Sequence, residues 1–162
     1  MKNSIFNFCT LFGIGQIPKY QGSFASLFVG LLWYAFILLL KPSFILQISI
    51  VSIFILLSIL SINEYMKTSA KDDPEEVVVD EACGIMIALL FMNLNTPSID
   101  YYSSFIYFIF ALLIFRVLDA LKPSIIYRIQ LLNTPSSILM DDVLAGILSL
   151  ILTVCLRINA II

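Results

Sequence analysis

Long apolar runs, separated by short polar segments, dominate the pattern of hydrophobic and polar positions along this chain. An apolar run of about 20 residues is long enough to cross a bilayer as a helix. The runs cover approximately residues 24–40, 44–62, 82–94, 101–118 and 143–158, and the third is short for a span. Prolines, an acidic segment and polar turns lie between them. The pattern predicts one all-α domain, residues 1–162: a polytopic membrane bundle with about five membrane-embedded helices.

Composition agrees with a membrane protein and narrows the chemistry. Hydrophobic residues make up 60% of the 162 residues and charged residues 12%, whereas a soluble domain has about 25% charged residues. The net charge of −2 gives no basic surface for nucleic acid. Histidine, the commonest general base and metal ligand, is absent. The cysteines, Cys9, Cys83 and Cys155, form no CxxC pair and are interpreted as packing residues.

The charged residues predict an orientation. With the N-terminus in the cytoplasm and five crossings, one group of basic residues falls inside: Lys2, Lys19, Lys67, Lys71, Arg116, Lys122 and Arg128. Only Lys41 and Arg157 then fall outside, which agrees with the positive-inside rule. Every acidic residue except Asp100 falls on the inner side as well. Acidic residues do not follow that rule, so their gathering indicates a shared site at the cytoplasmic face.

Three acidic clusters lie at ends of the apolar runs. Asp80 and Glu81 precede the third run, Asp141 and Asp142 precede the fifth, and Asp119 follows the fourth. We expect both acidic pairs at helix N-termini, where the helix dipole favours carboxylates. Arg116 and Lys122 are each three residues from Asp119, so the three side chains should share one side of a helix end.

These residue types point to phosphate chemistry. Carboxylates without histidine suit Mg²⁺, a hard cation that prefers oxygen ligands and often shares its shell with a substrate phosphate. Arg116 and Lys122 can hold phosphate oxygens, arginine as a fork and lysine as a point charge. Metal-binding carboxylates and phosphate clamps at the headgroup level of a membrane predict phosphoryl chemistry on a lipid.

Small residues mark places where helices should pack closely. Gly22, Ser26 and Gly30 recur every fourth residue, a spacing that lets membrane helices approach each other. Ser23 is a candidate N-cap of the first span, which would leave N–H groups available to a phosphate. Gly84, Ala145 and Gly146 lie one turn inside the two acidic pairs, so the helices bearing those pairs should also pack closely.

Four collinear motifs make the chain resemble the phosphatidylglycerophosphatase A family. The first is GIG at 13–15 with Pro18 and GSFAS at 22–26, and the second is DP at 73–74 with VDEACG at 79–84. The third is FRVLDALKP at 115–123, and the fourth is MDDVLAG at 140–146. The resemblance covers nearly the whole chain. Two loops depart from the family pattern: Gln21 and Ala25 replace a proline and a glycine, and Thr134-Pro135-Ser136-Ser137 replaces a glycine-rich segment.

The resemblance implies a Mg²⁺-dependent phosphoric monoester hydrolase of the bacterial inner membrane. It would convert phosphatidylglycerophosphate to phosphatidylglycerol and phosphate, with membrane lipids around it and no obligatory protein partner. Asp80, Glu81, Asp141 and Asp142 would be metal ligands or bases, and Asp119 would join them as a catalytic residue. The implied substrate-binding residues are Arg116, Lys122, Gly22, Ser23, Ser26 and Asp73. Direct hydrolysis and an aspartyl-phosphate intermediate both fit these residues.

A cation-coupled transporter or an ion-conducting subunit is the alternative from another class, since acidic residues inside membranes often mark ion paths. Such a path should place acidic residues at mid-membrane depth or at both faces. Here they occur at the ends of the spans and on one face, which favours the enzyme.

Overall fold

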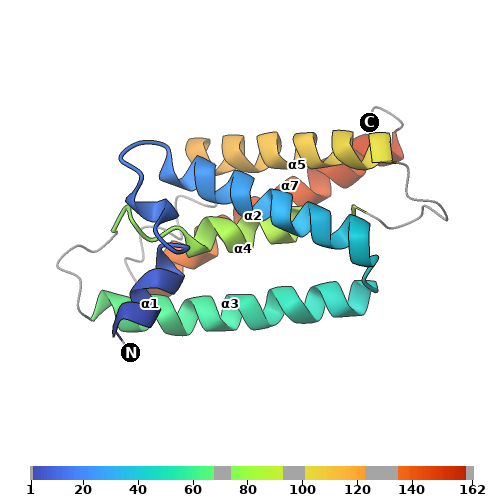
Figure 1. Cartoon of the computed structure of the whole chain (residues 1–162). Helices are drawn as coiled ribbons and strands as arrows, with labels where there is room; N and C mark the ends of the chain where they lie inside the picture. Colours follow the sequence, from blue (N-terminus) through green and yellow to red (C-terminus); the bar gives the residue numbers. More distant parts are fainter. Residues whose placement is uncertain (1, 68–73, 93–100, 123–134, 160–162) are drawn as a thin grey trace.

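The computed structural model describes residues 2–67, 74–92, 101–122 and 135–159, whose regular structure is entirely helical (Figure 1). The helices in chain order are α1 (Lys2–Cys9), the 3₁₀ turn η1 (Ile14–Gln16), α2 (Gln21–Leu40), α3 (Phe44–Met66), α4 (Val79–Ala88), α5 (Tyr101–Leu121) and α7 (Pro135–Ile158). The prediction of an all-α membrane bundle is confirmed. Four helices, α2, α3, α5 and α7, are long and apolar enough to cross a bilayer.

The third apolar run differs from the expected span. Its helix, α4, has only 10 residues and is about 15 Å long, half of a hydrocarbon core of about 30 Å. Nearly every residue of α4 is buried, and α4 packs against α2, α3, α5 and α7. The run is apolar because other helices surround it. Its hydropathy therefore resembles that of a span, and its length shows that α4 is too short to cross the bilayer by itself.

The starts of α4 and α5 nevertheless lie at opposite ends of the bundle. In Figure 1, α4 begins near the N-terminal end of the bundle and α5 begins at the opposite end. Where α4 has ended, the Met92 carbonyl accepts a 2.6 Å hydrogen bond from Arg157 Nη1 in the last turn of α7. Arg157 also lies over the Tyr107 ring, 5.5 Å from its centroid. A cation thus satisfies a backbone carbonyl that has no helical partner.

Two helices begin earlier than the hydropathy pattern predicted. α2 begins at Gln21 with Tyr20 as its N-cap residue, so Ser23 lies within the first turn and the prediction that it caps the helix is wrong. α7 begins at Pro135, and proline is favoured at a first helical position. Asp141 and Asp142 therefore lie nearly two turns inside α7 and not at its N-terminus. Polar residues in these first turns hid the helix starts from a reading of hydropathy.

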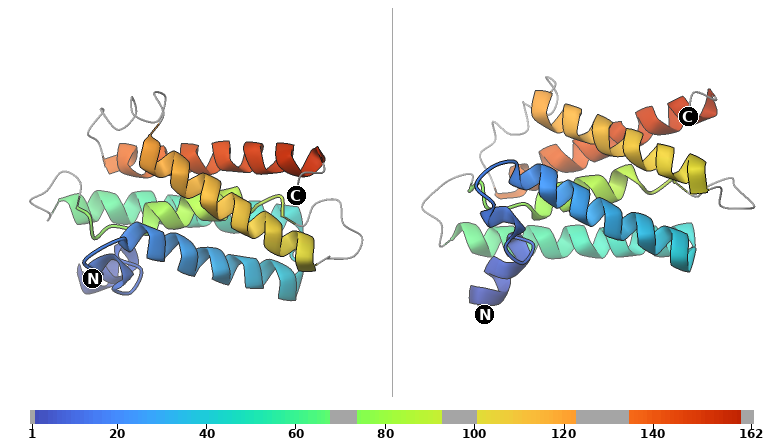
Figure 2. Two further views of the ribbon diagram at one scale, coloured as in Figure 1. Left: turned by 90° about the horizontal axis from the view of Figure 1, so that it is seen from above. Right: turned by 45° about the horizontal axis from the view of Figure 1, so that its top comes forward.

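The helices that carry the acidic pairs approach each other very closely. A side chain on Gly146 of α7 would collide with the backbone carbonyl of Gly84 in α4. A Cβ on Gly84 would lie 2.8 Å from the Asp142 carbonyl oxygen. The expected close packing at these glycines is confirmed. Figure 2 shows α5 crossing obliquely over α7, and α4 packs against both helices.

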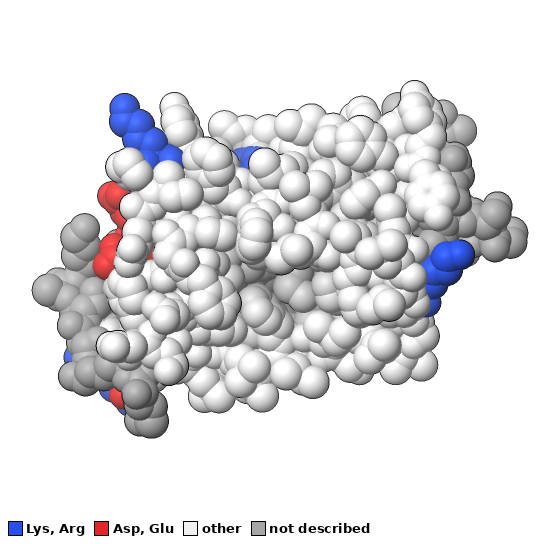
Figure 3. Space-filling model, viewed as in Figure 1, with Lys and Arg blue, Asp and Glu red and all other residues white. Residues whose placement is uncertain are grey.

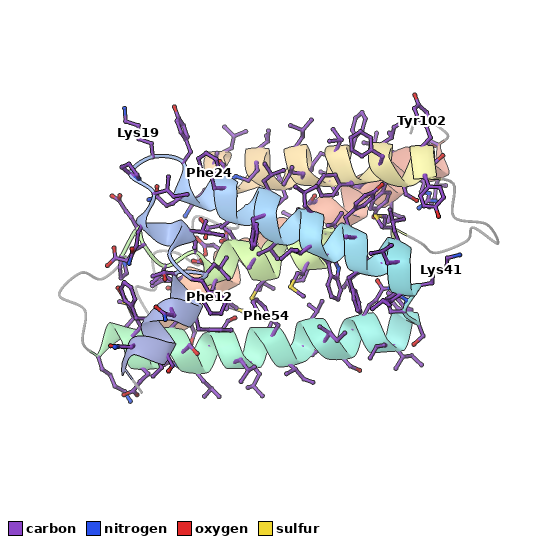
Figure 4. All side chains as sticks on the ribbon, in the orientation of Figure 1. Phe12, Lys19, Phe24, Lys41, Phe54 and Tyr102 are labelled. Carbon is purple, nitrogen blue, oxygen red and sulfur yellow. The ribbon has the colours of Figure 1, made fainter. Side chains whose placement is uncertain are left out.

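In the view of Figure 3, charged side chains lie mainly toward the two ends of the bundle, and the face between them carries few charges. All the acidic residues visible in this view lie at one end. The opposite end carries Lys41 and Tyr102, whereas Lys19 and Phe12 lie toward the acidic end (Figure 4). We use "acidic end" for the end of the bundle that holds Asp80, Glu81, Asp119, Asp141 and Asp142. The folding of the helices thus brings together clusters that lie far apart in sequence.

Candidate active site

Three carboxylates from two helices form a compact cluster at the acidic end. Asp80 and Glu81 come from the first turn of α4, and Asp142 comes from α7. One carboxylate oxygen of each lies within 4.8 Å of the other two. Asp80 and Asp142 are 7% and 5% exposed, so their negative charges are largely removed from water. Such a group is unfavourable unless a cation or protons neutralise it.

The donor set of this cluster fits a hard divalent cation. All three groups offer oxygen, which Mg²⁺ and Ca²⁺ prefer. Glu81 Oε2 is buried and has no hydrogen-bond partner among the described residues, as expected for an oxygen that would face a cation. The Asp80 carboxylate accepts a 3.1 Å hydrogen bond from the backbone N–H of Glu81. In the same way, the Asp141 carboxylate accepts a 3.1 Å hydrogen bond from the backbone N–H of Asp142.

Arg116 joins α5 to α2 beside this cluster. Its Nη1 atom lies 2.6 Å from Asp119 Oδ2 and 3.4 Å from Ser26 Oγ. The Ser26 hydroxyl itself donates to the Gly22 carbonyl, so its oxygen is oriented to accept from the guanidinium. Asp119 also lies beside Asp142, which links the arginine to the cluster. The predicted grouping of Arg116 and Asp119 on one side of a helix end is confirmed.

Lys122 and Asp141 form a second ion pair, between the end of α5 and α7. Lys122 Nζ lies 2.9 Å from Asp141 Oδ2. Burial alone would lower the pKa of Lys122, but its hydrogen bond to Asp141 and the charges of Asp141 and Asp119 outweigh burial and raise the pKa above its ordinary value. Lys122 is therefore positively charged at neutral pH. Asp141, which we expected beside Asp142 as a metal ligand, contacts this lysine.

Gly22 brings the backbone of α2 against the acidic cluster. A Cβ at this position would collide with Glu81 Oε1 and lie 3.4 Å from Arg116 Nη1. Ser26 lies one turn further along α2, and Ser23 is half-buried in the first turn. These three predicted substrate-binding residues thus belong to the helix that borders the cluster. Asp73, also predicted to bind substrate, lies outside the described residues.

Sequence reasoning missed one feature of the acidic end, a hollow of about 400 Å³ next to α2. Its polar side chains are Gln16, Gln21, Glu75 and Glu76, and Phe6 and Pro18 are among its apolar ones. Gln21 and Glu75 are 54 residues apart, but the Gln21 amide donates a 3.2 Å hydrogen bond to the Glu75 carbonyl. The hollow could not be inferred because its two walls are far apart in sequence and meet only in the folded chain.

The cysteines take no part in this arrangement. Cys9 and Cys83 are buried, and Cys155 is exposed. Burial raises the pKa of the Cys9 thiol to about 11, so it is protonated at neutral pH. The Cys83 thiol lies 3.4 Å from the Ser58 hydroxyl. Their interpretation as packing residues agrees with these positions.

The chain is similar to known lipid phosphatases over nearly its whole length. The family model of phosphatidylglycerophosphatase A matches residues 7–157 of this chain. A protein of Bacteroides thetaiotaomicron, provisionally named a phosphatidylinositol-3-phosphatase, is 32% identical over 150 residues. The aligned region covers 91% of this chain and 90% of that relative. No solved structure matches the chain significantly.

Proposed function

The chain belongs to the phosphatidylglycerophosphatase A family of lipid phosphatases, and from this premise we propose that it removes the terminal phosphate of phosphatidylglycerophosphate in a Mg²⁺-dependent reaction. The products are phosphatidylglycerol and inorganic phosphate. The observation that carries the proposal is the juxtaposition of the cluster Asp80, Glu81 and Asp142 with two cationic side chains at one end of a membrane bundle.

We assign the cation to the three clustered carboxylates. Asp80, Glu81 and Asp142 would hold it, and Asp141 is a candidate fourth ligand from the neighbouring position. Bound Mg²⁺ would supply positive charge to the phosphate oxygens and polarise the phosphoryl group for attack. The all-oxygen donor set and the unpartnered buried oxygen of Glu81 support this assignment.

Arg116 and Lys122 bind the substrate phosphate in this proposal. Both side chains are partly accessible, with 26% and 30% of their side-chain surface exposed. The contacts of Arg116 to Asp119 and Ser26 use Nη1, so its other N–H groups point elsewhere and can donate to phosphate oxygens. Asp119 holds the guanidinium and Asp141 holds the ammonium, which reduces the entropy lost when a phosphate binds.

A carboxylate of the cluster completes the chemistry. In direct hydrolysis it accepts the proton of the attacking water as the water oxygen bonds to phosphorus, and it returns that proton to the headgroup oxygen as the bond between that oxygen and phosphorus breaks. The alternative is attack by an aspartate on phosphorus, followed by hydrolysis of the acyl phosphate. Both routes use the same clamp residues and release one phosphate per lipid.

The name of the Bacteroides relative suggests a second candidate substrate, phosphatidylinositol 3-phosphate. Both lipids carry a phosphate monoester on a hydroxylated headgroup, so the same cluster and clamp can serve either. We place the reaction at the cytoplasmic face of the bacterial inner membrane, because the basic residues favour that orientation of the acidic end.

Phosphate release by the purified protein in detergent micelles tests the proposal. We expect release from phosphatidylglycerophosphate that requires Mg²⁺ and is abolished by a chelator. The Asp142→Asn variant, which keeps the size of the side chain, should release little. Equal release with and without Mg²⁺, or activity unaffected by Asp142→Asn, would contradict it. Faster release from phosphatidylinositol 3-phosphate would instead favour the second substrate.

A further inference from the structure

The hollow and the acidic cluster contact neighbouring residues of α2. Gln21 lines the hollow, and the next residue, Gly22, packs against the Glu81 carboxylate. The opposite wall includes Glu75 and Glu76, which precede the Asp80-Glu81 pair in the same segment. The hollow and the cluster therefore flank the same turn of α2.

The walls of the hollow are held in place by contacts between segments. Gln21 donates to the Glu75 carbonyl, and the Tyr65 hydroxyl donates a 2.8 Å hydrogen bond to Glu76 Oε1. The backbone of Gly15 packs so closely on the Glu76 carbonyl that a side chain would collide with it. Three separate parts of the chain thus fix this surface before any ligand binds, and the volume of about 400 Å³ is typical of small-molecule sites.

The chemistry of the hollow suits hydroxyl groups and not a phosphate. Two carboxylates accept hydrogen bonds, and two amides both donate and accept. A hydroxyl also donates and accepts, so a polyol can satisfy both kinds of group. No lysine or arginine of the described residues lines the hollow, and the negative charges of Glu75 and Glu76 repel anions.

We propose that this hollow, centred on Gln16, Gln21, Glu75 and Glu76, binds the hydroxylated part of the lipid headgroup while the phosphate monoester lies at the acidic cluster. The inference rests on the proposed lipid phosphatase function, and it assigns the selection between lipid substrates to this hollow. The subsite selects lipids whose phosphate is carried by a polyol, such as a glycerol or an inositol, over phosphatidic acid, whose phosphate is attached directly to the diacylglycerol.

Gln16 and Glu75 are the residues with which to test the subsite. Both side chains are exposed in the absence of a ligand, so a Gln16→Ala/Glu75→Ala variant should fold normally. The matched control is Glu64→Ala, which removes an exposed carboxylate paired with Lys67 on α3. Thermal unfolding in the same detergent verifies that all three proteins are equally stable.

The measurement is kcat/KM for phosphatidylglycerophosphate, phosphatidylinositol 3-phosphate and phosphatidic acid in matched micelles. The wild type should prefer at least one polyol lipid to phosphatidic acid, and the preferred one identifies the polyol. The double variant should lose about 10-fold on that lipid, the effect of a lost hydrogen bond to a charged group, mainly through KM. Its activity on phosphatidic acid, and all activities of Glu64→Ala, should be unchanged.

A second readout uses inhibitors instead of lipid substrates. Glycerol 3-phosphate or an inositol monophosphate should inhibit the wild type more strongly than inorganic phosphate, and the double variant should lose this difference. Equal losses on every substrate, no loss on any, or an unchanged ratio of inhibition constants would refute the subsite alone. Absence of phosphate release from all three lipids by the wild type would refute the proposed function and the subsite together.

Discussion

Gly22 on α2 faces the Glu81 carboxylate so closely that a methyl group at position 22 would occupy the place of Glu81 Oε1. The atom in the way belongs to the end of a flexible side chain, so Gly22→Ala should fold with little loss of stability. The carboxylate must move out of the cluster instead. We expect phosphatase activity to fall by about 10-fold or more, since misplacing a catalytic group by 1 Å can cost about 100-fold. Phosphate release and thermal unfolding of one preparation measure both effects.

Gly30→Ala is the matched control on the same helix. Its Cβ would lie 3.1 Å from Ile85 Cγ1 and 3.2 Å from Phe108 Cε2, which are apolar packing atoms away from the acidic end. This variant should lower the unfolding temperature and leave kcat nearly unchanged. If Gly30→Ala were inactive and Gly22→Ala active, the result would contradict the expected displacement of Glu81. The two glycines would then matter only for helix packing.

Asp80→Asn and Asp142→Asn should each remove most of the activity while the protein still inserts into the membrane. Each change keeps the shape of a buried side chain and deletes one charge of the three-carboxylate cluster. Loss of a group that acts in the transition state typically costs about 100- to 10,000-fold. Initial rates of phosphate release at saturating Mg²⁺ measure this loss.

Glu64→Gln provides the comparison for these variants. Glu64 is exposed and paired with Lys67 on the surface of α3, so it offers a carboxylate outside the cluster. Exposed pairs contribute little to stability, and we expect full activity. A Glu64→Gln variant as impaired as Asp80→Asn would mean that the overall charge of the acidic end matters and not the cluster.

Arg116→Lys should weaken substrate binding although the charge is kept. The guanidinium contacts Asp119 and Ser26 through one nitrogen, which leaves other donors for a phosphate. A lysine ammonium cannot keep both contacts and also form a fork to phosphate oxygens. We expect KM to rise by about 10-fold, the effect of one charge-assisted hydrogen bond. A normal KM for Arg116→Lys, measured in the same micelles, would argue against a phosphate clamp at this position.

Much of this structure could be predicted because the membrane imposes strong rules on sequence. The four long helices follow from apolar length, and the separation of Lys19 from Lys41 at opposite ends follows from counting crossings. The gathering of Asp80 with Asp142 was predictable because both precede apolar runs on the same side. Gly84 and Gly146 predicted that their helices pack closely, because small residues in membrane helices typically lie where two backbones approach each other.

The remaining features depend on contacts between segments that carry no periodic signal. α4 is apolar like the spans, and its shortness and its position among other helices distinguish it from them. The start of α7 at Pro135 precedes its apolar run, so Asp142 lies deeper in the helix than hydropathy suggests. The pairing of Lys122 with Asp141 and the approach of Gly22 to Glu81 require the three-dimensional path of the chain.

Replacing all three cysteines by alanine should preserve activity. Cys9 is a protonated thiol at neutral pH because burial raises its pKa to about 11, and the buried Cys83 thiol contacts the Ser58 hydroxyl. Neither is suited to nucleophilic attack, which requires a thiolate. The buried substitutions should lower the unfolding temperature by a few degrees through lost packing. A folded triple variant without activity would refute this expectation.

Magnesium should stabilise the folded protein even without substrate. Asp80, Glu81 and Asp142 place three carboxylates together, whereas Arg116 pairs with Asp119 and Lys122 pairs with Asp141, so the cluster keeps an excess of negative charge. The cluster exists only when α4 and α7 are packed, so a divalent cation binds the folded state in preference to the unfolded one. At 100 times its dissociation constant, such a ligand adds about 2.7 kcal/mol to the free energy of unfolding.

The unfolding temperature in detergent should therefore rise by several degrees on addition of Mg²⁺, about the shift expected for a domain of this size. NaCl at the same ionic strength should have much less effect, because screening does not replace a ligand that is bound by three carboxylates. Asp80→Asn and Asp142→Asn should have a smaller rise, since each removes one of the charges that attract the ion. Their unfolding temperatures without Mg²⁺ should equal or exceed that of the wild type, because each also relieves repulsion between buried carboxylates. A rise of equal size in the wild type and both variants would place the stabilising cation elsewhere and leave protonation as the means by which the cluster is neutralised.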